Sequence, residues 1–139
     1  MRAWAMGLLC SLAIAGCGAD SPPAEPTARL AISTSATAPL LFNNGLGVPV
    51  GLPGGVGFGL MNGGTVALVV QSATYVGAPA ITLTTRSSLP ATLGFNQELV
   101  VDLTCTPPAT NTYDGVVNIA SNAVNLPMAE VFVSCVGTP

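Results

Sequence analysis

The chain has 139 residues, of which 6% are charged, and its formal net charge is −3. Half of the residues are hydrophobic, and lysine and histidine are absent. Nucleic acids and anionic lipid surfaces are bound by clusters of Lys and Arg, so this composition excludes both as direct electrostatic partners. Hydrolases with an activated Ser or Cys are disfavoured too, because the usual basic partner of the nucleophile is missing. The length suits one domain.

The first 17 residues have the pattern of an export signal. Arg2 supplies the positive charge, and the apolar run 7–15 is far shorter than the roughly 20 residues that cross a bilayer. The run ends in Ile14-Ala15-Gly16-Cys17, which resembles the lipobox of bacterial lipoproteins. The resemblance implies that residues 1–16 are removed and that Cys17 is lipidated. The alternative is an incidental cysteine near an ordinary cleavage site.

Residues 17–27 are expected to be a lipidated cysteine followed by a flexible linker, because three prolines, two acids and small residues cannot bury a core. Two or three acyl chains hold a protein firmly at a membrane. In the sorting rule of Gram-negative lipoproteins, Asp after the cysteine favours the inner membrane, so Gly18 favours the outer one. We therefore expect an exported protein, lipid-anchored to the bacterial cell envelope.

Residues 28–139 are expected to form the folded domain. Short β-branched runs alternate with Gly, Pro and Asn, and no segment has a helical period, which is typical of an all-β sandwich or barrel. In chain order, the expected strands are 29–35, 39–42, 56–62, 65–75, 80–85, 98–105, 115–121 and 129–135. Asn62-Gly63-Gly64 is a turn signal. Phe132 falls on the polar face of the last strand, which the pattern does not explain.

Two cysteines lie in the expected domain, Cys105 and Cys135. Each ends an expected strand, and its side chain falls on the apolar face. In an oxidising compartment we expect a disulfide between them, which would stabilise the fold by on the order of 3 kcal/mol. Two buried thiols are the alternative. A zinc site is not expected, because two cysteines without histidine do not provide four ligands.

No residue group in the sequence has the spacing of a catalytic or cofactor site. Glu98 and Asp102 lie about 13 Å apart on one strand face, whereas glycosidase carboxylates lie about 5 to 9.5 Å apart. The glycine-rich run 45–59 is interrupted by prolines and no helix follows, so it is interpreted as a loop between strands. Tyr113 precedes a strand and is expected to bind backbone as a corner tyrosine. We therefore expect no enzyme and no cofactor.

Four segments resemble the ASH/hydin-like domain, which also occurs in bacterial choice-of-anchor D proteins. They are LLFNNGLGVPVG (40–51), VGFGLMNGG (56–64), the stretch 89–122 and VFVSCVG (131–137). The similarity covers about residues 38–137. It departs from the family pattern in the extra residues between Phe42 and Val48 and in Cys105. The resemblance implies an immunoglobulin-like β-sandwich of about seven or eight antiparallel strands that binds or spaces other components.

The sequence thus predicts a lipid-anchored binding or spacer module of the cell envelope, with the membrane and an unidentified envelope protein as partners. One alternative is a structural subunit that assembles by pairing of edge strands. A second is a carbohydrate-binding module. The small number of aromatic residues disfavours it, and Tyr75 is the residue whose mutation would test it.

Overall fold

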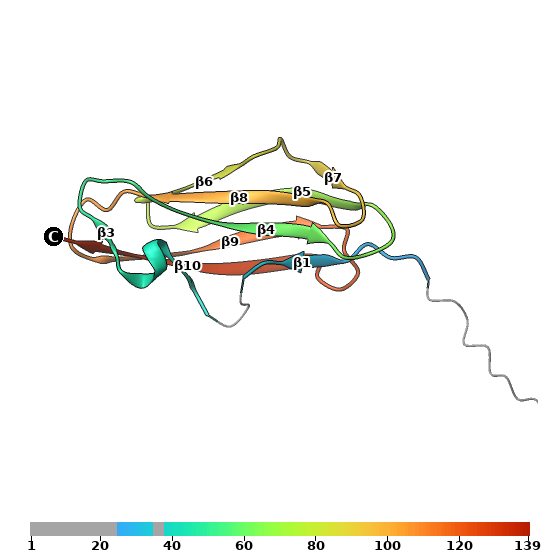
Figure 1. The fold of residues 1–139 in the computed structure, drawn as a ribbon, viewed down its shortest axis with the longest axis horizontal. Helices are drawn as coiled ribbons and strands as arrows, with labels where there is room; N and C mark the ends of the chain where they lie inside the picture. The colour runs from blue at the N-terminus through green and yellow to red at the C-terminus, as the bar shows by residue number, and fades with distance from the viewer. Residues whose placement is uncertain (1–24, 35–37) are drawn as a thin grey trace, which may run out of the picture.

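The computed structural model describes residues 25–34 and 38–139, so Cys17 and the expected signal lie outside the described residues. Two sheets pack face to face as an elongated sandwich (Figure 1). One sheet has the order β1 (Leu30–Ile32), β4 (Gly54–Asn62), β8 (Glu98–Cys105), β6 (Ile81–Thr85). The other has the order β2 (Leu40–Leu41), β10 (Met128–Thr138), β9 (Thr112–Ser121), β5 (Leu68–Gly77), β7 (Ala91–Leu93), and β3 (Val48–Pro49) also pairs with β10.

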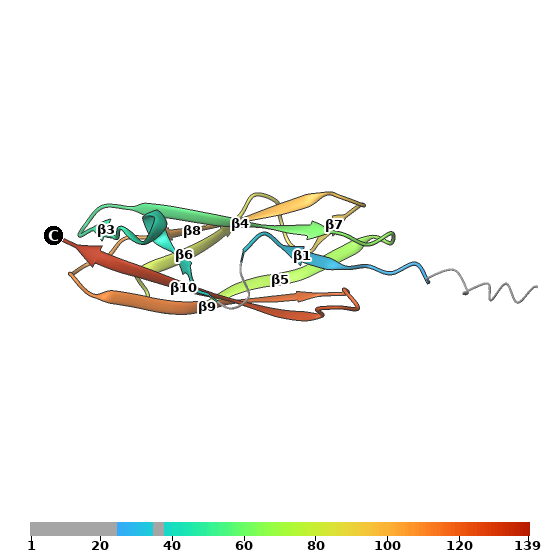
Figure 2. The same ribbon diagram turned by 60° about the horizontal axis from the view of Figure 1, so that its bottom comes forward.

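The expected all-β, immunoglobulin-like sandwich is confirmed, and Figure 2 shows its two layers. The longer strands pair antiparallel, as expected, and the two-residue strands β2 and β3 differ in running parallel to β10. The strands β3 and β7 were not expected. Within residues 25–34 and 38–139, no helix is long and apolar enough to span a membrane.

Strand β8 follows its alternating sequence, with buried side chains at every second residue from Leu99 to Cys105. β10 alternates in the same way, but it continues to Thr138. The expectation that Cys135 ends its strand was therefore wrong. The continuation is held by β3, whose Val48 pairs with Gly137.

The glycine-rich run was only partly a loop. Its last part, from Gly54, belongs to β4 and pairs with β8. The outer face of β4 carries glycines, and the Glu98 and Asp102 side chains of β8 lie close against Gly59 and Gly57. A Cβ atom at either glycine would enter the space of those acidic side chains, which would have to shift.

A β-bulge in β5 changes which side chains face the core. Val70 is buried, and the register against β9 shifts between Val70 and Ser72. After the shift, Ala73 and Tyr75 pack against the core. Val66, which the expected strand 65–75 included, precedes β5 and is exposed.

Candidate binding surface

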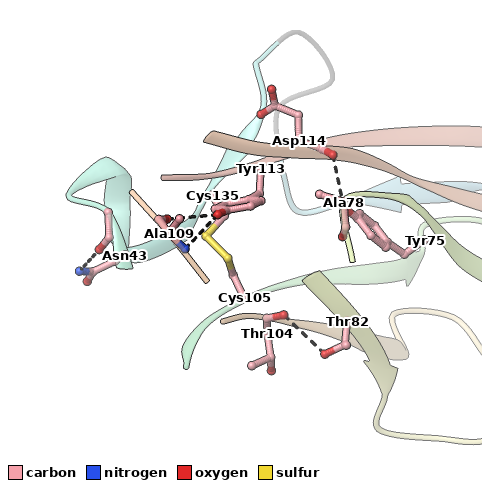
Figure 3. The surroundings of a disulfide bond; sticks show 11 residues. Asn43, Tyr75, Ala78, Thr82, Thr104, Cys105, Ala109, Tyr113, Asp114 and Cys135 are labelled. Carbon is pink, nitrogen blue, oxygen red and sulfur yellow. Dashed lines mark hydrogen bonds between the residues drawn. A yellow bond between two sulfur atoms is a disulfide. The ribbon is translucent and has the colours of Figure 1, made fainter. Parts of the chain in front are cut away.

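A disulfide joins the two sheets near one end of the sandwich (Figure 3). Cys105 comes from β8 and Cys135 from β10, and their Cα atoms are 6.5 Å apart. Both residues are completely buried. The expected pairing is confirmed, and these two cysteines have a structural position in the core.

Tyr113 is a corner tyrosine, as expected. Its hydroxyl accepts a hydrogen bond from the Ala109 backbone N–H and donates one to the Ala109 carbonyl, both at 3.1 Å. Figure 3 shows the ring beside Cys135, with Ala109 at the turn that leads into β9. The side chain therefore fixes this turn to the disulfide end of the core.

Tyr75 lies on the inner side of β5 and fills the space above two glycines. A Cβ atom on Gly115 or Gly77 would overlap it. Its hydroxyl donates to the Ala78 carbonyl at 3.2 Å. Burial raises the pKa of the Tyr75 hydroxyl, and the negative charge of Asp114 raises it further. Because both tyrosine side chains are engaged in this way, neither offers an open ring for stacking on a sugar.

The two carboxylates of β8, Asp102 and Glu98, each contact a neighbouring residue at the surface of the four-stranded sheet. Asp102 accepts a hydrogen bond from the guanidinium of Arg86 at 2.9 Å, and this bond raises the pKa of Arg86. Glu98 packs against Gly59. Throughout the described residues, no three His, Cys, Asp or Glu side chains gather as a metal site would require.

The outer face of the six-stranded sheet carries a line of three apolar side chains, here called the apolar row, of which the middle one, Val116, is half-buried. Phe132 of β10 pairs with Val116 of β9, and Val116 pairs with Val76 of β5. Phe132 is 54% exposed and Val76 is 61% exposed. The row crosses three adjacent strands, so it is about 10 Å long. The row is therefore a candidate interaction surface, because adjacent exposed apolar side chains can contact a partner.

Two acidic residues flank the apolar row. Asp114 lies two residues before Val116 on β9, and Glu130 lies two residues before Phe132 on β10. Both are exposed, and Figure 3 shows the Asp114 side chain pointing away from the disulfide. The two described arginines lie elsewhere, before β1 and after β6.

A hollow of about 450 Å³ opens beside Phe132. It is lined by Ala38, Pro39, Asp114, Gly115, Phe132 and Val133. A carboxylate and an aromatic ring thus border the same hollow. This combination suits a side chain with an apolar stem and a positive end.

A second hollow, of about 300 Å³, lies between β1 and the first half of β10 and is mostly apolar.

The first residues of β10 form a strand edge. The Ser121 N–H donates to the Pro127 carbonyl, which places the backbone groups of residue 127 on the β9 side. Backbone N–H and C=O groups alternate in direction along a strand, so those of Met128 and Glu130 point away from β9. On that side of β10, β2 and β3 pair only with residues from Val133 onward. Among the described strands, none pairs with Met128 or Glu130 on that side.

Sequence reasoning placed Phe132 on the outer face but did not find the apolar row. The row depends on the register of three strands that are distant in sequence. Val116 and Val76 are single valines in ordinary β-sequence, and nothing in the sequence marks them as neighbours of Phe132.

No protein-family model and no curated protein matches the chain. Among solved structures, the chain is similar to the ASH/PapD-like domain 7 of human CEP192, with a TM-score of 0.56 and 12% identity. That match covers 99% of this chain and 98% of the domain. A protein of unknown function from Porphyromonas gingivalis W83 has a TM-score of 0.63 and 16% identity, over 86% of this chain.

The chain spans about half of that P. gingivalis protein, 51% of its length. The Vibrio cholerae VesB protease matches 80% of this chain, but only 32% of VesB is covered, with a TM-score of 0.57 and 13% identity. At these identities the similarity concerns the fold. A Ser-His-Asp triad cannot form within this chain, because it has no histidine. The chain thus has an immunoglobulin-like sandwich of the ASH/PapD-like type.

Proposed function

We propose that the chain is an exported lipoprotein whose sandwich is a non-catalytic binding module of the cell envelope. The observation that carries this proposal is the apolar row, which crosses three strands of one sheet and is exposed at Phe132 and Val76. The Cys17 motif supplies the expected anchor. The ASH/PapD-like fold supports a role without catalysis, as does the distant and partial nature of the protease similarity.

The anchor can be tested separately from the binding face. Cells are grown with an alkyne-bearing fatty acid, and its incorporation into wild type and Cys17→Ala is compared. We expect label in the wild type and none in the variant. Label that persists in Cys17→Ala would contradict the proposed anchor.

The binding face is tested by photo-crosslinking in intact cells. A photoreactive residue is placed at Glu130 or Thr74, beside the apolar row, or at Thr82 or Thr84 on the four-stranded sheet. All four side chains are exposed. We expect a discrete adduct from the first pair only, and its loss when Phe132→Ser is added. Adducts only from the second pair would overturn the choice of face.

The absence of adducts at all four positions would overturn the binding role and leave a spacer. Phe95→Ser is the matched control for Phe132→Ser. Phe95 is also exposed, at 64%, but lies in the loop between β7 and β8. Loss of the adduct in both variants would point to a general defect and contradict a role specific to Phe132.

Assembly through edge strands is the second candidate, because Met128 and Glu130 direct backbone groups away from β9. The edge of the four-stranded sheet, at β1, is covered by a side chain. The Asn125 side chain accepts from the Leu30 N–H and donates to the Leu30 carbonyl, both at 2.9 Å. A Met128→Pro variant would remove one of these two backbone N–H donors. If assembly is correct, adducts of the chain to itself should dominate in the wild type and disappear in this variant.

A further inference from the structure

The surface around the apolar row has an apolar centre and a carboxylate on each side, and a polypeptide partner could contact all three. Val116 is central on β9, Asp114 lies about 7 Å along the same strand, and Asn118 lies about 7 Å in the opposite direction. Glu130 is the β10 partner of Asn118. A carboxylate therefore lies on each side of the apolar row, at the spacing of every second residue of an extended chain.

These carboxylates have no cation beside them in the described part of the chain. The one ion pair found there joins Arg86 and Asp102, on the other sheet. Two copies of this face would bring carboxylates together, and opposed like charges disfavour association. Charge complementarity therefore favours a different partner that carries positive groups.

The hollow beside Phe132 indicates how one positive group would be held. Asp114 and Phe132 line it together with Pro39. A lysine or arginine can pack its methylene stem against the ring and proline while its charge approaches the carboxylate. A purely apolar side chain would leave Asp114 without a partner there.

Taking the proposed binding function as its basis, we propose that this face binds an extended polypeptide with a basic–x–apolar–x–basic pattern. Its apolar side chain rests on the apolar row, and one basic side chain enters the hollow beside Phe132. The second basic side chain approaches Glu130.

The test uses the full lipidated chain in neutral detergent micelles and labelled nine-residue peptides. The probe contains Arg-Thr-Leu-Thr-Arg, with a photoreactive leucine at the centre. Two control peptides replace both arginines by glutamate or place them next to each other. We expect the probe to crosslink to β9 and β10 and the controls to crosslink at least tenfold less. The yield should also fall as salt is raised.

Variants of the chain test which side chains bind the peptide probe. Asp114→Asn and Glu130→Gln should each weaken probe binding about 1.5- to 5-fold, the range for exposed ion pairs. Phe132→Ser should weaken it about tenfold or more, as for a central aromatic contact. Glu98→Gln, which neutralises an exposed acid on the other sheet, should leave binding unchanged.

Equal labelling by the glutamate peptide, or an unchanged yield in Asp114→Asn, would overturn the pattern. This failure is distinguishable from failure of the binding function. If the cellular adduct at Glu130 forms while the basic peptide does not bind, the face binds a partner of other chemistry. If neither is observed, both proposals are wrong.

Discussion

At the scale of single residues, Asn62 is the most buried of the described polar side chains. It is fully buried at the end of β4. Its amide nitrogen donates to the carbonyls of Val66 and Leu93, and its side-chain oxygen accepts from the Gly64 N–H, all at 2.9 Å. One side chain thus satisfies three backbone groups, two in the loop between β4 and β5 and one at the last residue of β7.

We expect Asn62→Ala to lower the free energy of unfolding by roughly 2–4 kcal/mol, because buried backbone groups lose their partners and a small cavity remains. The measurement is urea denaturation. Asn122→Ala is the matched control, since its amide also bonds to backbone but is exposed. A loss of about 0.5–1 kcal/mol is expected there. Equal losses in both variants would show that burial of Asn62 does not matter.

The residues differ in how well sequence could predict their roles. Tyr113 was predicted as a corner tyrosine, because its position before a strand is a local signal. Asn62 was interpreted as part of a turn, and its bond to Leu93, 31 residues away, has no local signal. Phe132 was unexplained for the same reason, since its neighbours come from other strands.

At the scale of elements, alternation predicted the long strands well. β8 has the predicted bounds, because it is buried on one face from end to end. β2 and β3 have two residues each and exist as strands because β10 offers them an edge. β2 lies within the expected strand 39–42, whereas β3 was not predicted, because two residues are too few for a period. The bulge in β5 was also not predicted, because the shift between Val70 and Ser72 depends on the register against β9, which lies far along the chain.

The contact of β5 with β9 depends on Gly115. A Cβ atom there would overlap the Tyr75 ring, which packs against the core and whose hydroxyl is bonded to the Ala78 carbonyl. We expect Gly115→Ala to lower the free energy of unfolding by about 1–3 kcal/mol through overpacking. Thermal or urea denaturation measures the loss.

Gly63→Ala is the control, because a Cβ atom at Gly63 meets nothing within 4 Å. A change within about 0.5 kcal/mol is expected for it. In a Tyr75→Ala background, Gly115→Ala should cost little, since the overlapping ring is gone and the two sites are coupled. The same cost in both backgrounds would exclude the ring as the cause.

At the scale of the whole molecule, β1 enters at one end of the sandwich and the chain finishes at the other (Figure 1). The disulfide and the Tyr113 corner lie toward the end where the chain finishes (Figure 3). Elsewhere the two sheets are held by apolar packing between their inner faces. Cys105–Cys135 is thus a covalent connection between the sheets, far along the chain from the expected anchor.

Reduction of this disulfide should lower the free energy of unfolding by on the order of 3 kcal/mol, because a 30-residue loop in the unfolded chain is released. Urea denaturation with and without reductant measures the difference. The double variant Cys105→Ala, Cys135→Ala should lose more than the reduced wild type, since it also removes two fully buried sulfur atoms from the core. In that variant, reductant should have no effect. If reductant leaves the wild-type midpoint unchanged while thiol counting confirms reduction, the bond between the sheets does not stabilise the sandwich, and apolar packing alone accounts for its stability.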